Sequence, residues 1–380
     1  MDPLRDVKLT PDPRTGHVVA IVPVLDGPDV QQEFDFPNPT LWSPETPKLY
    51  EAVVRIGEDA RTVSFGFRTV EFRNGKFCLN GKERQIRGVC RHQDRAGKGW
   101  AVSAADEEED VKWIKAMGAD PMPEGRAETL VRETRDLFRH LDPTRPTVAA
   151  SNDPRRKELN AIPDALGLNL YPLWYDIKEL YAGGMQATVA RSVGMNRRPA
   201  ICVSEYGGSA CIDQHDDPLV RPESGGRFHP EEYQAWMHAQ LYRDLAGNPQ
   251  VWGSFLWQMF DCGSDCRQEG SLPGLNEKGL VTFDRKTAKD AFCFYKANWN
   301  PEPMLHLVGS RLTETTNSAV TVCGFCNAGS VTLTVNGRVI GTQVPDKVKC
   351  VVWRDVSLTQ GDNRIVLTCE ALRAAAVWKR

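Results

Sequence analysis

Long apolar runs are missing from this 380-residue sequence, and so is a strong excess of charge of one sign. No stretch approaches the roughly 18 apolar residues that suggest a membrane-spanning helix. The N-terminus, MDPLRDVKLT, has no apolar run after a basic start, so no signal peptide is visible and a cytoplasmic location is expected. The formal net charge of −3 gives no reason to expect nucleic acid or an anionic membrane as a partner. The acidic run 107–110 is expected to be a solvated helix start.

Paired cysteine motifs are also scarce. The chain has 11 cysteines, and of these Cys323 and Cys326 have the CxxC spacing of some zinc and redox sites. A zinc site would require a second pair or nearby histidines, and neither occurs at a matching spacing. We therefore expect no metal and no cofactor, and we interpret the cysteines as small strand residues of a reducing compartment. A metal or redox protein is the minor alternative.

The sequence does contain three regions of different pattern within an ordinary globular composition. Hydrophobic residues make up 41% and charged residues 26% of a chain long enough for about two to four domains. Residues 1–72 are rich in strand patterns, residues 73–300 alternate strands and helices, and residues 301–380 return to strands. Asn336-Gly337 is a strong hairpin signal in the last region. The pattern predicts an α/β domain between two all-β domains.

The central region is typical of a parallel βα barrel. Strands are predicted at 86–90, 146–151, 165–171, 200–208 and 251–261, and helices at 104–118, 125–141 and 231–247. Apolar strands that end in polar residues and are followed by helices fit that fold, in which the chemistry lies at the C-terminal ends of the strands. Five parallel strands cannot close a barrel of the usual shear, so either the sheet is open, or another chain completes it, or neighbouring segments fill in.

Polar and aromatic side chains gather at four of these strand ends. They are Arg91, His92, Asp94, Asn169, Tyr171, Trp174, Tyr175, Glu205, Trp257 and Asp261. Such a set suits a sugar, whose C–H faces stack on aromatic rings and whose hydroxyls need hydrogen-bonding partners. Each aromatic residue by itself is more often a core residue, and Glu205 by itself could be a salt-bridged structural acid. The agreement of four strand ends favours a sugar site.

Longer motifs surround these residues. They include LWSPETPKLYEAVV, FGFRTVEF, FCLNGKERQIRGVCRHQD, VSEYGG and WGSFLWQMFD. Together they resemble the family 2 glycoside hydrolases, the β-galactosidase and β-glucuronidase group, over nearly the whole chain. The resemblance implies an incomplete (β/α)8 TIM-type barrel at 73–300 between two immunoglobulin-like β-sandwiches, a partial one at 1–72 and a C-terminal one at 301–380.

The resemblance also assigns roles to residues. VSEYGG matches the nucleophile strand, which makes Glu205 the implied nucleophile of a retaining mechanism, and WGSFLWQMFD makes Trp257 an implied sugar platform. His92, Asn169, Tyr171 and Tyr175 are expected to bind the substrate. A small carbohydrate is the expected partner, and the assignment allows for a homo-oligomer.

Two features depart from the family pattern. The chain starts within the second of the family's domains, without the sugar-binding jelly roll. In addition, KAMGAD runs directly into PMPEG, where the family has several βα units and the strand whose Asn-Glu pair carries the acid/base. Retaining glycosidases need a second carboxylate about 5–5.5 Å from the nucleophile. The nearest acids in sequence are Asp120 and Glu124, and Glu124 is a weak candidate, because an acid there more often interacts with a helix dipole.

Two sugars remain open as the substrate. Asn276 and Lys278, in LNEKG, resemble the Asn-x-Lys motif that binds the uronate carboxylate in β-glucuronidases. KDAFCFYKANW and the C-terminal region look more like a branch described as β-galactosidases, which also carries this motif. The sequence analysis therefore favours hydrolysis of terminal β-D-galactosides, with β-glucuronides second. A catalytically impaired sugar-binding protein is the competing class.

The missing acid/base makes a prediction about the leaving group. General acid catalysis contributes roughly 10²–10⁴-fold, and poor leaving groups need most of it. We therefore expect aryl glycosides of acidic phenols to be hydrolysed far faster than lactose, and azide to accelerate turnover. If lactose and nitrophenyl galactoside had comparable kcat/KM, with no azide effect, a substitute acid would have to exist.

Overall fold

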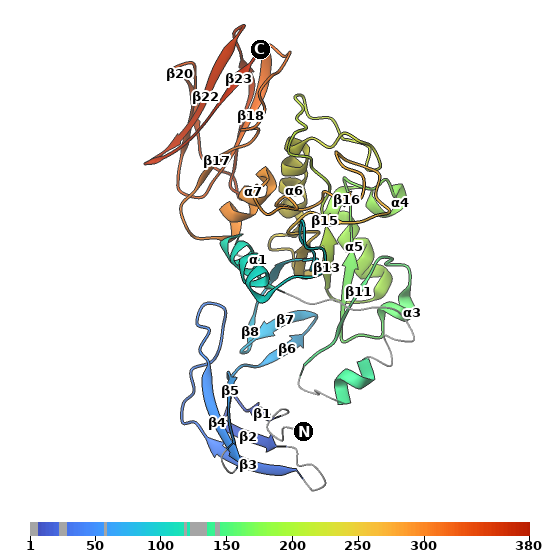
Figure 1. Ribbon diagram of the computed structural model, residues 1–380. Coiled ribbons are helices and arrows are strands. Elements are labelled where there is room, and N and C mark those ends of the chain that lie inside the picture. Colours follow the sequence, from blue (N-terminus) through green and yellow to red (C-terminus); the bar gives the residue numbers. More distant parts are fainter. Residues whose placement is uncertain (1–6, 23–28, 57–58, 118–119, 122–134, 141–144) are drawn as a thin grey trace. The chain divides into compact units, whose positions relative to one another are not determined.

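The computed structural model describes residues 7–22, 29–56, 59–117, 120–121, 135–140 and 145–380 (Figure 1). The chain divides into two compact units. One consists of residues 1–84 and 138–146, and the other of residues 85–137 and 147–380. The predicted domain boundaries after residues 72 and 300 stay predictions.

The first unit is built from short antiparallel strands around aromatic side chains. Its described strands are β1 (Lys8–Pro11), β2 (His17–Val22), β3 (Val30–Asp35), β4 (Tyr50–Ile56), β5 (Asp59–Phe65), β6 (Val70–Arg73), β7 (Lys76–Leu79) and β8 (Lys82–Glu83). They pair in the orders β1-β2-β3, β4-β5 and β6-β7-β8. Phe36 packs edge to face on Tyr50, Phe65 and Phe67. The β-rich character of this region is confirmed, and its immunoglobulin-like identification stays a prediction.

A six-stranded parallel sheet forms the centre of the second unit, in the order β10-β9-β14-β13-β12-β11. Its strands are β9 (Ile86–Val89), β10 (Asp120–Pro121), β11 (Val148–Ser151), β12 (Ala165–Asn169), β13 (Ile201–Tyr206) and β14 (Val251–Leu256). All neighbouring pairs are parallel, as the βα pattern predicts. The five predicted strands are present, and the two-residue β10 is an addition. Within the described residues, β10 and β11 are the two edge strands.

Helices connect the strands as βα units require. The described helices with assigned bounds are α1 (Ala104–Met117), α3 (Lys157–Asn160), α4 (Lys178–Tyr181), α5 (Gly184–Asn196), α6 (Glu231–Leu245) and α7 (Asp290–Trp299). α1 and α6 confirm two predicted helices. The third, predicted at 125–141, falls mostly outside the described residues, of which 135–140 are helical. No helix in the described part of the chain is both long enough and apolar enough to cross a membrane.

Two antiparallel sheets near the C-terminus pack on a shared core, with the orders β17-β18-β21 and β20-β19-β22-β23. Their strands are β17 (Leu305–Leu307), β18 (Ala319–Cys326), β19 (Val331–Val335), β20 (Arg338–Gln343), β21 (Cys350–Ser357), β22 (Asp362–Cys369) and β23 (Leu372–Lys379). Val322 of β18 and Leu333 of β19 are buried in the same core, so both sheets contribute to it. The predicted Asn336-Gly337 turn joins β19 to β20.

Cys323 and Cys326 do not share a site. They lie three positions apart in β18, so their side chains leave opposite faces of the strand. Cys326 is buried in the core between the C-terminal sheets, whereas Cys323 packs against the core around the parallel sheet. Both are free thiols. Their CxxC spacing therefore reflects two separate packing positions rather than a metal or redox pair.

Buried charges connect the C-terminal sheets to α6 and α7. The Glu231 carboxylate accepts hydrogen bonds from Arg311 Nε at 2.9 Å and from the Asp290 backbone N–H at 2.7 Å. The Asp290 carboxylate accepts from His306 Nε2 at 2.7 Å and from the Gly309 N–H at 2.8 Å. Burial lowers the pKa of His306, but the hydrogen bonds to Asp290 and Cys293 and the charges of these two groups together outweigh burial, and the pKa rises to about 10. His306 is therefore cationic at neutral pH.

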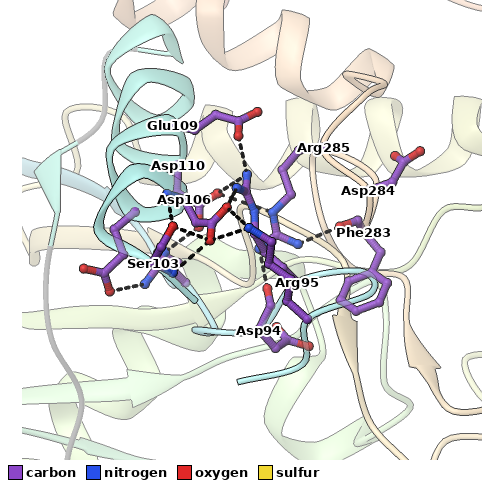
Figure 2. Close-up of polar contacts among 12 residues, drawn as sticks. Asp94, Arg95, Ser103, Asp106, Glu109, Asp110, Phe283, Asp284 and Arg285 are labelled. Carbon is purple, nitrogen blue, oxygen red and sulfur yellow. Dashed lines mark hydrogen bonds and ion pairs between the residues drawn. The ribbon is translucent and has the colours of Figure 1, made fainter. Parts of the chain in front are cut away.

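A second group of buried charges fixes the segment that follows β9 (Figure 2). Asp110, fully buried on α1, binds Arg91 at 2.8 Å, Arg95 at 3.4 Å and Arg285 at 3.3 Å. Arg285 also donates to the Asp94 carbonyl at 2.7 Å. The acidic run is thus only partly the solvated helix start that was expected, because residues 107–109 are exposed and Asp110 is not. Its burial ties the segment after β9 to α1 and to residue 285.

Removal of the Asp110 carboxylate should destabilise the protein, because the arginines around it lose their shared partner. Breaking a buried ion pair costs about 3–5 kcal/mol. Asp110→Ala should therefore lower the free energy of unfolding in urea by about 3 kcal/mol or more. Glu108→Ala, which removes an exposed pair with Lys112 on the same helix, is the matched control and should leave the stability nearly unchanged. Equal stabilities of the two variants would show that the arginines find other partners.

Candidate active site

The candidate site lies at the C-terminal ends of the central parallel strands. Glu205 is near the end of β13, where it is half-buried while the other side chains of the strand are buried. The chain then passes close to Trp174, since a Cβ on Gly208 would lie only 2.4 Å from that ring. The YGG sequence after Glu205 therefore permits a close approach that a larger residue would block. A carboxylate at this position can meet a ligand above the sheet.

Tyr171, two residues beyond the end of β12, donates a hydrogen bond to Glu205. The distance from its Oη to Oε2 of Glu205 is 2.6 Å, which is typical of a strong, charge-assisted bond. Burial, and then the neighbouring Glu205 charge, raise the pKa of Tyr171 well above its usual value of 10. The phenol therefore stays protonated and serves as a permanent donor that orients the carboxylate.

Asn169 stands beside Glu205 at the end of β12. The two are register partners across a bulge between β12 and β13. Oδ1 of Asn169 accepts a hydrogen bond from Ser204 Oγ at 2.9 Å, and the Leu170 N–H donates to the Glu205 carbonyl at 2.8 Å. Asn169 thus supports the backbone that carries Glu205, and its predicted contact with the substrate stays a prediction.

Lys278 brings a buried cation next to the aromatic side chains. Its side chain is 1% exposed, and its Nζ lies 5.4 Å from the ring centre of Trp174 and 5.7 Å from that of Tyr175. The rings of Tyr175 and Tyr171 meet edge to face with centres 5.3 Å apart. A continuous line of contacts therefore runs from Lys278 through the two tyrosines to the carboxylate that Tyr171 binds.

The Lys278 ammonium has no hydrogen-bond acceptor among the described residues. Burial, and then the nearby Arg267 charge, lower its pKa to about 8. Asn276, the other member of the motif, is 5% exposed, and its Oδ1 accepts the Lys278 backbone N–H at 3.2 Å. In this structure, Asn276 shapes the turn that presents the lysine.

His92 and Trp257 form a second contact at the strand ends. Their rings meet edge to face with centres 5.1 Å apart. Nε2 of His92 is buried without a hydrogen-bond partner in the described part of the chain. Trp257 is half-buried, and part of its surface packs on the main core. Its use as a sugar platform stays a prediction.

Some of the polar strand-end residues make hydrogen bonds or ion pairs within the protein. Arg91 binds Asp110, and the Asp94 carboxylate accepts the Gly263 N–H at 2.7 Å. Asp261 is 3% exposed and binds Lys289 Nζ at 2.8 Å. These residues were expected in the sugar site because a polar residue after an apolar strand gives the same signal in both roles.

The acid/base candidates from the sequence are Glu124 and Asp120. Glu124 and the side chain of Asp120 lie outside the described residues.

Lys289 was not anticipated, because TAKDA gives no sign that its lysine is buried. One signal in the sequence could have led to Lys289: Asp261 is an acid that follows an apolar run and has no basic residue near it in sequence, so a buried basic partner could have been sought elsewhere in the chain.

Tyr171→Phe should weaken any reaction that uses Glu205, because it removes the hydrogen bond to the carboxylate and nothing else from the ring. A hydrogen bond to a charged group contributes about 1.5–3 kcal/mol, so we expect kcat/KM to fall roughly tenfold or more. Tyr50→Phe is the control, because it removes a hydroxyl that accepts the Thr40 N–H in the first unit, and it should have little effect. An unchanged rate for Tyr171→Phe would mean that Glu205 is oriented by other groups.

Comparisons with known proteins find similarity to glycosyl hydrolases. The profile of the family described as glycosyl hydrolases family 2 matches residues 8–68, and that of the family's TIM barrel domain matches residues 70–123. A β-glucuronidase of Bacteroides fragilis is 32% identical over 438 aligned positions, which include 91% of this chain and 62% of the relative. A β-galactosidase of Pseudoalteromonas haloplanktis is 44% identical over 84 residues, 20% of this chain and 8% of the relative. The crystal structure of a putative β-galactosidase from Bacteroides fragilis has a TM-score of 0.87 at 22% identity, covering 98% of this chain and 72% of that chain.

The chain spans about three fifths of the length of the Bacteroides fragilis β-glucuronidase. That match extends over 438 positions but uses 91% of a 380-residue chain, so the relative contains stretches with no counterpart here. The barrel-domain profile stops at residue 123, at the KAMGAD–PMPEG junction. Both observations agree with the internal shortening expected at that junction.

Proposed function

Because this chain belongs to family 2 of the glycosyl hydrolases, we propose that it is a retaining β-glycosidase with Glu205 as its nucleophile and a β-glucuronide as its substrate. The observation that carries the choice of sugar is the buried Lys278 ammonium, which lacks an acceptor among the described residues and is linked by aromatic contacts to Tyr171 and Glu205.

A buried ammonium is costly unless an anion pairs with it. The carboxylate of a glucuronide would supply that anion, whereas the hydroxymethyl group of a galactoside would not. The Bacteroides fragilis relative is named a β-glucuronidase, and its match covers most of this chain. The proposal therefore reverses the order of sugars that the sequence analysis favoured.

Glu205 would attack the anomeric carbon, forming a bond to the sugar as the bond to the aglycone breaks. Water would then release the sugar with retained β configuration. Tyr171 would hold the carboxylate in line and would bind it again when it leaves. In the absence of an assigned acid, the aglycone departs most readily as a weakly basic phenolate, and Glu124 is the first residue to mutate in a search for the acid/base.

A β-galactosidase is the second candidate, favoured by the local match to the Pseudoalteromonas haloplanktis enzyme. A sugar-binding protein without activity is the third, favoured by the absence of the Asn-Glu pair at the KAMGAD–PMPEG junction.

Rates of hydrolysis with nitrophenyl glucuronide and nitrophenyl galactoside separate all three candidates. We expect the glucuronide to be hydrolysed faster, Glu205→Gln to abolish hydrolysis without changing the unfolding midpoint, and Lys278→Met to remove the preference. Faster hydrolysis of the galactoside would overturn the assigned sugar, and an active Glu205→Gln would overturn the nucleophile.

The affinity for a glucuronide should depend on pH through Lys278. Only the ammonium form attracts the carboxylate, and in the free protein this form is lost as the pH rises through about 8. KM for nitrophenyl glucuronide should therefore be lowest below pH 8 and rise about tenfold per pH unit well above it, while KM for the galactoside should not show this rise. In Lys278→Met the dependence should disappear. A glucuronide KM that stays constant up to pH 9.5 would contradict a role for the ammonium.

A further inference from the structure

We propose that Lys289 is a positioning residue for the substrate carboxylate, and that it acts by fixing residues 275–281, the Lys278 loop, against the segment that follows Glu205. The inference rests on the proposed function and adds to it a residue that does not touch the sugar.

Lys289 joins three segments of the second unit through one atom. Its side chain is 1% exposed. Its Nζ donates to the Ala210 carbonyl at 2.7 Å, to Oδ1 of Asp261 at 2.8 Å and to the Glu277 carbonyl at 3.0 Å. Ala210 follows the nucleophile strand, Asp261 follows β14, and Glu277 immediately precedes Lys278. All three donors of the ammonium are used.

The groups that Lys289 holds also bind the loop on both sides of Lys278. The Glu277 carbonyl accepts the Ala210 N–H at 3.0 Å, and Oδ1 of Asp261 accepts the Gly279 N–H at 2.8 Å. The loop passes directly against the backbone here, because a Cβ on Gly279 would lie 2.1 Å from the Asp261 nitrogen. The residues before and after Lys278 are therefore both anchored to the Lys289 cluster.

A separate set of bonds holds the loop through the Glu277 side chain. The Glu277 carboxylate accepts the Ser271 N–H at 2.8 Å and the Ser271 hydroxyl at 2.5 Å, and it contacts Cys211 Sγ at 3.2 Å. These bonds do not involve Lys289. Loss of the Lys289 ammonium should therefore make the loop more mobile while the Glu277 bonds keep it in place. A variant of Lys289 can then be folded and still position Lys278 poorly.

A buried ion pair is by itself weak support for stability, because apolar residues of similar volume often replace it at no cost. What the Lys289–Asp261 pair provides is a fixed geometry among three backbone segments. If it served stability alone, its loss would reduce the hydrolysis of all sugars alike. If it positions Lys278, its loss should affect substrates that carry a carboxylate far more than those that do not.

The test compares Lys289→Met, the double variant Lys289→Met/Asp261→Asn and the matched control Lys286→Met. The double variant avoids an unpaired buried acid, so it keeps the test valid if the single variant folds poorly. In the control, the same change is made at a lysine whose side chain is 81% exposed. For each protein, kcat and KM are measured with nitrophenyl glucuronide and nitrophenyl galactoside, glucuronate binding by calorimetry, and amide hydrogen exchange across residues 275–281.

We expect the glucuronide KM to rise tenfold or more in both Lys289 variants, since a displacement of about 1 Å can cost 10²-fold. The galactoside kcat should change less than about twofold, and exchange in the Lys278 loop should become faster. Lys286→Met should behave as the wild type. An unchanged glucuronide KM in a folded Lys289 variant, or an equal loss for both sugars, would overturn the positioning role and leave the proposed function intact.

The wild-type results separate the two proposals. If the wild-type protein binds glucuronate but hydrolyses neither glycoside, the proposed glycosidase activity is wrong. Weaker glucuronate binding and faster loop exchange in the Lys289 variants would then still support the positioning role. If the wild-type protein binds no glucuronate, there is no carboxylate to position, and both the assigned sugar and this inference are wrong.

Discussion

Pairing of buried charges is the constraint on which the second unit depends most. Asp110 binds three arginines, and Lys289 binds three acceptors. The partners are far apart in sequence; Asp110 and Arg285, for example, are separated by 175 positions. A charge left alone in the interior costs several kcal/mol, so arrangements in which these segments do not meet are strongly disfavoured. The segments that carry His92 and Lys278 are located by this requirement.

The candidate site then follows from the direction of the strands. Parallel neighbours place their C-terminal ends at one edge, which brings Glu205 of β13 and Tyr171 beyond β12 within hydrogen-bonding distance. Lys278 lies on a later loop. Its ammonium contacts the ring of Tyr175, which packs against Tyr171. The site therefore combines strand ends, which a regular sheet positions, with one loop, which needs its own anchors.

Much of this could be predicted from the sequence, because apolar strands with polar ends are visible in a single chain. Glu205, Tyr171 and Tyr175 were expected together on those grounds. The assignment of Asp261 to the site failed, because its partner Lys289 lies in a polar stretch with no mark of burial. Lys278 was identified by its motif, but its contact with Trp174 depends on loop packing that no local pattern encodes.

The missed and misjudged elements also have physical causes. α5 was overlooked although Met185, Val189 and Val193 recur every fourth residue and are buried, because Gly183-Gly184 at its start is typical of a loop. The two residues of β10 are too few to show any period. The strand predicted to reach residue 261 ends at 256. Apolar residues continue beyond it because they pack on the core as irregular chain.

The ion pairs between α6, α7 and the C-terminal sheets have a consequence for how the protein comes apart. A cut before Leu305 would remove Arg311 and His306. The carboxylates of Glu231 and Asp290 would then be left in the interior without these partners. The parallel sheet would then lose support from strands with which it shares no backbone pairing. Melting of either part therefore removes charge partners from the other, so the second unit should denature as a single cooperative block, and its C-terminal sheets are not a detachable module.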